Sequence, residues 1–234
     1  MELQPQNAAE KVILERHSVR AFTAQDVSEE CVRDILTKAA RAPSGTNTQP
    51  WKVYVVKGKI KQKITDQVVA SVEAIFHGEL AKVQFKPAYL YYSEQWFDPY
   101  LRRRRENGWG LYNILGITKD NKLAIHKQQL RNYEFFNAPV GLFFTTHKAL
   151  EAGAKMAIAM LMQNIMLLAK AQGLDTCPQA SWNDYHELIM PILGADDNEI
   201  LICGMSLGFA DKTEKVNQYV TTREPLDEFV RFLE

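Results

Sequence analysis

Residues 152–173, AGAKMAIAMLMQNIMLLAKAQG, decide the fold because they are apolar on nearly every side over a helical length. Lys155, Gln163 and Asn164 interrupt the apolar run and Lys170 closes it, so the run falls far short of the roughly 20 apolar residues that a bilayer span requires. A helix with no polar face lies at the centre of a domain or between subunits. We therefore predict a buried helix, with a dimer interface among the surfaces that can cover it, and no membrane partner.

Two predicted strands flank this helix. Residues 140–146, VGLFFTT, predict the first, and residues 199–207, EILICGMSL, predict the second. Between the helix and the second strand we expect a loop at DTCPQASW, residues 175–182, and another helix near residues 183–193. Few strands separated by long helices predict a mixed α/β architecture in which helices sandwich a sheet.

The N-terminal part follows the same alternation. In DVSEECVRDILTKAARAPSG, Ser28 is a plausible N-cap, and apolar residues recur with helical spacing until Pro43 stops the helix near Arg41. Residues 51–56, WKVYVV, predict a strand, and residues 59–76 predict an amphipathic helix.

The remaining segments are less regular. Residues 86–136 are aromatic, charged and poorly periodic, and they predict short helices that form a cover. Residues 213–234 begin polar and end in a short amphipathic element, PLDEFVRFLE. Because no repeat or linker divides the chain, we expect residues 1–234 to form one domain that carries this cover and this tail.

Charge and cysteine content exclude several partners. Lysine plus arginine equals aspartate plus glutamate at 28 each, so no global field attracts nucleic acid or an anionic membrane. The three cysteines are widely spaced and fit no metal-binding pattern, which favours a reducing compartment. The first residues lack the apolar core of a signal peptide. We expect a cytoplasmic protein.

Several familiar catalytic motifs are missing from the sequence. It contains no GxGxxG after a strand, no GxxxxGK[ST], no HExxH and no GxSxG, and its five histidines are scattered singly. Nucleotide-binding, metalloprotease and hydrolase functions therefore lose their usual support, and no metal site is predicted. An enzyme with this sequence would depend on a bound cofactor for its difficult chemistry.

The stretch ERHSVRAF, residues 15–22, concentrates hydrogen-bond donors. Arg16, Ser18 and Arg20 alternate, and in an extended segment residues two apart point to the same side. Guanidinium groups match phosphate oxygens, and the hydroxyl adds a donor without charge. The stretch indicates either a phosphate site or a solvated basic turn.

The stretch APSGTNTQPW, residues 42–51, is a second cluster. Small residues let the backbone approach a ligand, and Asn47 and Gln49 each carry a donor and an acceptor, which suits the edge of a flat heterocycle. The alternative is a plain turn, because Pro, Ser, Gly and Asn dominate turns.

Two weaker clusters follow, GLDTCPQASW after the buried helix and TTREPLDEF near the C-terminus. In this order the four clusters resemble the FMN-dependent nitroreductase superfamily over essentially the whole chain. The segment PYLRRRRENGWGLYNILGI, residues 99–117, is similar to a segment of the nitroaromatic, nitrobenzoate-type reductases.

The resemblance implies an FMN site. Arg16, Ser18 and Arg223 would hold the phosphate, His17 would contribute through its backbone, and Arg20 would reach the pyrimidine end of the ring. Pro178 and Gln179 would lie along the isoalloxazine. The other subunit would supply the cap, formed by Pro43, Ser44, Gly45 and Asn47.

The resemblance also implies a fold and an activity. The fold is a three-layer helix, mixed sheet and helix sandwich, assembled as an intertwined homodimer. NADPH or NADH reduces the flavin at N5, and a small-molecule electron acceptor such as a nitroaromatic compound reoxidises it in ping-pong order. No side chain is catalytic, and Arg20 tunes the ring. The alternatives are a reductive dehalogenase of the same fold and a non-catalytic flavin-binding or flavin-processing protein.

Three details are open at this point. Many members carry Lys where this chain has Arg20. Gln128, Arg131 and Asn132 are candidates for the flavin edge. Residues 102–105, four consecutive arginines, are either a solvated helical stretch whose members face different ways or a cluster that recruits a carboxylated or phosphorylated molecule.

Overall fold

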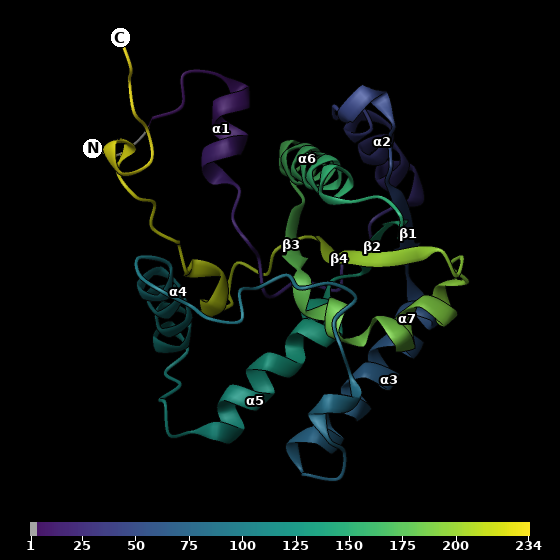
Figure 1. Ribbon diagram of the computed structural model, residues 1–234. Coiled ribbons are helices and arrows are strands. Elements are labelled where there is room, and N and C mark those ends of the chain that lie inside the picture. Colours follow the sequence, from purple (N-terminus) through teal and green to yellow (C-terminus); the bar gives the residue numbers. More distant parts are fainter. Residues whose placement is uncertain (1–3) are drawn as a thin grey trace.

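A four-stranded antiparallel sheet lies between two layers of helices (Figure 1), in a computed structural model that describes residues 4–234. The strand order is β1-β2-β4-β3. The strands are β1, Lys52–Val56; β2, Val140–His147; β3, Asp175–Gln179; and β4, Glu199–Gly208. The only parallel pairing within these residues is an isolated bridge between Ser18 and Thr176. The predicted sandwich of helices around a sheet is confirmed.

Within residues 4–234, seven α-helices surround the sheet. They are α1, Ala8–Glu15; α2, Glu29–Ala39; α3, Gly58–Phe76; α4, Tyr100–Ile114; α5, Lys122–Leu130; α6, Ala152–Ala171; and α7, His186–Leu193. Ser28 caps α2 as predicted, because its Oγ accepts from the Cys31 N–H at 3.1 Å. Residues 86–136 contain α4 and α5, and Figure 1 shows α4 standing to one side of the sheet.

The layers form two separate cores. On one face of the sheet α2 and α6 enclose Ile35, Leu142 and Ile165, and on the other face α3 and α7 enclose Ile64 and Phe143. In Figure 1, α2 and α6 lie above the sheet, and α3, α5 and α7 lie below it. Helix α6 is the element that the sequence placed in the core, and its buried side is confirmed.

Helix α6 is nevertheless not buried all round. Ile158, Leu161 and Ile165 are buried, whereas Met156 is 67% exposed and Met160 is 37% exposed. Within residues 4–234, α6 is the one helix long and apolar enough to cross a membrane, but it packs against α2 and the sheet as a core helix. The exposed methionines leave an apolar stripe without a partner in the isolated chain.

The predicted loop at residues 175–182 was wrong. Its first five residues form β3, and residues Ala180–Tyr185 form a short 3-10 helix. Proline weakened the strand signal, but β3 is an edge strand, where a residue without an N–H is tolerated. The helix expected near residues 183–193 accordingly begins only at His186. In the tail, regular structure is limited to short 3-10 turns at Lys215–Gln218 and Leu226–Glu228.

One end of the sheet is tied together by a buried carboxylate. Glu199 on β4 is 8% exposed and accepts from Lys52 Nζ at 2.7 Å and from the Tyr54 hydroxyl at 3.0 Å, both on β1. It also accepts from the Thr145 hydroxyl on β2. Burial acts to raise the pKa of Glu199, but the hydrogen bonds from Lys52, Thr145 and Tyr54 outweigh it and hold the pKa below its ordinary 4.5.

We expect Glu199→Gln to lower the free energy of unfolding by about 2 kcal/mol at pH 7, because the amide nitrogen cannot accept the hydrogen bonds that the buried carboxylate accepts from Thr145 and Tyr54. A carboxyl with a lowered pKa stabilises the fold above its unfolded pKa, and this stabilisation is lost as the pH falls through the folded value. The difference in urea unfolding between the two proteins should therefore be largest at neutral pH and shrink as the pH falls below the ordinary pKa of about 4.5. A difference of the same size at pH 3 and at pH 7 would contradict this account.

Candidate functional site

The donor-rich segment lies along the free edge of the sheet. Ser18 bridges to Thr176 of β3, and the Val19 N–H donates to the Thr176 carbonyl at 3.0 Å. Val19 and Ala21 are buried, whereas Arg16, Ser18 and Arg20 are partly exposed. The alternation expected for an extended segment is therefore present, and it points the donors away from the core.

Two arginines from distant parts of the chain meet at the start of this segment. Burial lowers the pKa of Arg16, and the neighbouring charge of Arg223 lowers it further. No carboxylate of the described residues lies within ion-pair distance of Arg16, Arg20 or Arg223. Two guanidinium groups near enough to act on each other, with no counter-charge beside them, favour an anion at this place.

Two buried polar atoms close to these arginines have no hydrogen-bond partner. They are His17 Nε2 and Thr176 Oγ1. Nδ1 of the same imidazole lies 3.1 Å from the Glu15 carbonyl. Unpartnered buried groups cost free energy, so both atoms indicate a polar ligand at this edge of β3.

Arg20 is held from the tail. Its backbone N–H donates to Asn217 Oδ1 at 2.8 Å, and Asn217 Nδ2 donates to the Ala21 carbonyl at 2.8 Å. Its guanidinium donates to the Ser18 carbonyl at 3.3 Å and lies near the Cys177 thiol. Burial raises the pKa of Cys177 to about 11, although Arg20, Ser18 and Arg16 act against it. The thiol is therefore neutral at physiological pH, and the charge at this point belongs to Arg20.

The end of β3 borders an apolar hollow. Its volume is about 350 Å³, and Pro178, Tyr89 and Met162 are among the residues that line it. The Gln179 side chain turns the other way, donating to the Asn132 carbonyl and lying 2.6 Å from the Ser206 hydroxyl. A flat ligand in the hollow would therefore meet Pro178 and not the side-chain amide of Gln179, which is buried.

The loop between α2 and β1 does not join this site. The Pro50 carbonyl accepts from Thr146, which pairs with Ile200, whereas Ser18 bridges to Thr176, which pairs with Leu207 at the opposite end of β4. The loop also leads into β1, which is the other edge of the sheet. One chain therefore brings together the predicted residues around β3 but not Pro43, Ser44, Gly45 and Asn47.

This loop is exposed and conformationally unusual. Pro43, Gly45 and Asn47 are exposed, and Thr46, Asn47 and Gln49 have φ angles of 49°, 57° and 46°. The Ser44 hydroxyl fixes the turn by accepting from the Gln49 N–H at 3.0 Å. Left-handed conformations in residues other than glycine are costly and concentrate at binding sites. This geometry is compatible with the ligand-binding alternative, and residues 43–47 are called the recognition loop below.

The four consecutive arginines face different ways on α4. Arg102 pairs with Glu106 at 3.0 Å, Arg103 pairs with Glu224 at 2.7 Å, and Arg104 lies over the Trp96 ring at 4.8 Å. Each of these three guanidinium groups is engaged by the chain itself. The arrangement favours a solvated helical stretch whose members face different ways over a cluster that recruits a carboxylated or phosphorylated molecule.

Two contributors to the site were not found from the sequence. Asn217 is an ordinary polar residue in KVNQY, and its contact with Arg20 joins residues 197 positions apart. Thr176 lies inside the GLDTCPQ stretch, but a single Thr carries no signal until its hydroxyl is known to be buried without a partner.

Several known proteins are similar to this chain in sequence and in fold. The signature described as the nitroreductase family matches residues 13–209. The chloronitrobenzene nitroreductase of Comamonas testosteroni is 38% identical, over 95% of either chain. The 4-nitrobenzoate reductase of Nocardioides sp. (strain LMS-CY) is 36% identical, over 97% of this chain and 90% of its own. The crystal structure of the FMN and NADPH-dependent nitroreductase NfnB from Sphigopyxis sp. strain HMH has a TM-score of 0.91 at 35% identity, covering 97% of this chain and 99% of its own.

Proposed function

The chain belongs to the nitroreductase family, and we propose that it is an FMN-dependent NAD(P)H oxidoreductase that reduces nitroaromatic or related electron-poor compounds. Two relatives support this proposal because they are reductases of nitroaromatic substrates, and the similar crystal structure is that of an FMN and NADPH-dependent enzyme. Iodotyrosine deiodinases, which would favour the reductive dehalogenase alternative, are 22% identical to this chain, against 38% and 36% for the two nitroaromatic reductases.

The residues at the edge of β3 fit FMN. Arg16 and Arg223 form an uncompensated cationic pair for the phosphate, and Ser18 adds a neutral donor. The unpartnered His17 Nε2 and Thr176 Oγ1 add two polar atoms for the sugar-phosphate chain. Pro178 and the hollow beside it suit a flat apolar ring. When bound, FMN supplies hydride transfer, which no side chain of this site can perform.

The charged residues of the chain divide their tasks by position. Arg16 and Arg223 bind the phosphate, while Arg20, held by Asn217 and beside Cys177, places a fixed positive charge at the other end of the segment. A fixed charge in a partly desolvated site stabilises negative charge that develops during reaction. Because the Cys177 thiol stays neutral, it does not offset this charge.

The single observation that carries the proposal is the cationic pair of Arg16 and Arg223 beside two unpartnered buried polar atoms. The test begins with the purified full-length protein, which should be yellow or take up FMN in a one-to-one ratio. Without oxygen, NADPH or NADH should bleach the flavin band, and a nitroarene should restore it. Protein that takes up no FMN would overturn the proposal, and bound FMN that neither nicotinamide bleaches would leave only a flavin-binding function.

The active form in this proposal is a homodimer. The apolar stripe of α6 is exposed, and the recognition loop of residues 43–47 lies at the far end of the sheet from Arg16. Contact between two copies along α6 would cover the stripe and allow the loop of one chain to cap the FMN of the other. The end of the tail, residues 225–234, exposes Phe229 and Phe232 and extends away from the body (Figure 1), which suits wrapping around the second copy.

We expect Met156→Glu to weaken the dimer at least about tenfold, because the interface would then bury an unpaired carboxylate. Analytical ultracentrifugation measures this change, and FMN content should fall with the dimer because the loop cap is lost. Ile60→Glu, on α3 below the sheet, is the matched control, since Ile60 is also exposed at 47%. Equal dimer stability in the two variants would rule out α6 as the interface.

The proposal includes one domain, residues 1–234, and a cytoplasmic location. Core contacts run without interruption from α2 to β4, and the family signature spans residues 13–209. Cys177 and Cys203 are buried free thiols and Cys31 is a partly exposed one, which suits a reducing compartment.

A further inference from the structure

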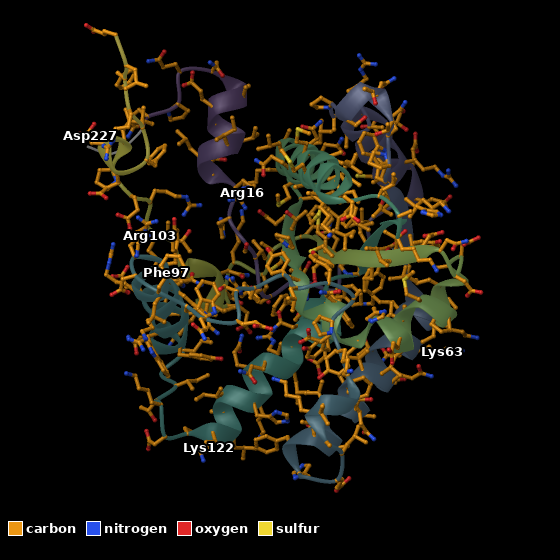
Figure 2. All side chains as sticks on the ribbon, viewed as in Figure 1. Arg16, Lys63, Phe97, Arg103, Lys122 and Asp227 are labelled. Carbon is orange, nitrogen blue, oxygen red and sulfur yellow. The ribbon has the colours of Figure 1, made fainter. Side chains whose placement is uncertain are left out.

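The tail meets α4 at a shared carboxylate. Glu224 Oε1 accepts from Arg103 Nε at 2.7 Å and from Arg102 Nη2 at 3.2 Å. Burial acts to raise the pKa of Glu224, but the hydrogen bond from Arg103 exceeds it, and the pKa is lowered. Figure 2 shows Arg103 at the end of α4 nearest the tail, on the same side of the molecule as Arg16. Two guanidinium groups from one helix thus hold a single tail residue.

A second contact between the tail and α4 lies further along the helix, at Gly110. A Cβ built on Gly110 would lie 2.6 Å from the Tyr219 ring, so the ring packs directly on the bare backbone of the helix. A Cβ built on Gly108 would meet nothing within 4 Å. Residues 215–224 contain only one short 3-10 turn, and side-chain contacts therefore fix their position.

Arg223 connects these contacts to the candidate phosphate site, because it is adjacent to Glu224 in the sequence and its charge acts on Arg16. Its Nη1 donates to Thr221 Oγ1 at 2.6 Å and to the Thr222 carbonyl at 2.8 Å. The same tail segment reaches Arg20 through Asn217. Displacing Glu224 would therefore move the guanidinium that pairs with Arg16.

We propose that Glu224 and Gly110 dock the tail on α4 and thereby position Arg223 for the FMN phosphate, so that phosphate binding and docking of the α4 cover are coupled. Glu224 and Gly110 are positioning residues here, and neither touches the cofactor. The identity of the phosphate ligand rests on the proposed function, whereas the docking itself does not.

The direction in which Glu224→Gln changes the affinity for FMN distinguishes a positioning role of Glu224 from a simple effect of its charge. Replacing Glu224 by Gln makes the surroundings of Arg223 more positive, which by charge alone would tighten the binding of an anion. Docking predicts the reverse, because the released tail no longer holds Arg223 in place. Glu106→Gln is the matched control, since Glu106 also pairs with Arg102, at 3.0 Å, and borders the same hollow as the tail, but makes no hydrogen bond or ion pair with a tail residue among residues 4–234.

The experiment measures flavin affinity of the full-length protein after removal of its flavin, by quenching of flavin fluorescence. We expect Glu224→Gln to weaken FMN binding about fivefold, in line with a partly exposed ion-pair network. Riboflavin affinity should not change, because riboflavin lacks the phosphate that Arg223 holds. Glu106→Gln should leave FMN affinity unchanged or slightly higher.

A glycine pair repeats the test without altering charge. Gly110→Ala should push away the Tyr219 ring and weaken FMN binding, while Gly108→Ala gains the same helix propensity without the clash. Hydrogen exchange of residues 215–224 should accelerate in Gly110→Ala and not in Gly108→Ala, whether or not flavin is present.

The outcomes separate the two proposals. Tighter or unchanged FMN binding in Glu224→Gln, or equal losses for FMN and riboflavin, would overturn the positioning role. Equal hydrogen exchange in the two alanine variants would overturn the docking. Failure of the unaltered protein to bind FMN would instead refute the proposed function, and the exchange measurement would still decide the docking.

Discussion

Replacing Arg20 with alanine is expected to lower kcat about 100-fold to 1,000-fold while the protein remains yellow. The magnitude is that of removing one fixed donor or charge from a site where negative charge develops. Arg20 is suited to this role because its guanidinium is partly buried, lacks a carboxylate partner within residues 4–234, and neighbours a thiol whose raised pKa keeps it neutral.

The backbone position of this residue does not depend on its side chain. Asn217 binds the Arg20 N–H and the Ala21 carbonyl, and both bonds survive the substitution. We therefore expect Arg20→Ala to keep its FMN. Arg20→Lys retains a charge at this place and should recover much of the rate, which a purely structural role would not require.

Stopped-flow kinetics should show whether the loss of kcat in Arg20→Ala arises in reduction of the flavin by the nicotinamide or in reoxidation of the flavin. A variant with normal rates, or one that loses FMN and activity in parallel, would contradict the division of roles between Arg16 and Arg20.

Elements with uniform local signals could be predicted from the sequence. The periodicity of α2 and α3 and the apolar runs of β2 and β4 depend on neighbours within a few residues, and these elements formed close to their predicted bounds. Strand β3 was missed because what makes DTCPQ a strand is its partner β4, with its edge position allowing Pro178.

The candidate site likewise contains residues that could be predicted from the sequence and residues that could not. Resemblance singled out the residues whose chemistry is visible, and the structure gathers Arg16, Arg20, Pro178 and Arg223 near one edge of the sheet. Asn217 and Glu224 could not be predicted, because their importance comes from contacts about 200 and 120 residues away in the sequence. Positioning by long-range hydrogen bonds leaves no local pattern.

The second large effect is expected at the phosphate. Arg16→Ala should weaken FMN binding about 100-fold, because one charge-assisted contact to an anion contributes about 1.5–3 kcal/mol and a tenfold change corresponds to about 1.4 kcal/mol. Burial and Arg223 both act against the charge of Arg16, so the site gains when a phosphate enters and neutralises the pair.

Equilibrium dialysis against FMN and riboflavin checks this prediction. The loss of affinity should be large for FMN and small for riboflavin. Raising the salt concentration should reduce the difference in FMN affinity between the altered and unaltered proteins, because salt screens the same phosphate–arginine attraction that the substitution removes. Arg105→Ala, an exposed arginine on α4, is the control for the general loss of one positive charge. If Arg105→Ala weakened FMN binding as much as Arg16→Ala, the net charge of the protein would hold the cofactor. That result would contradict a specific phosphate site formed by Arg16 and Arg223.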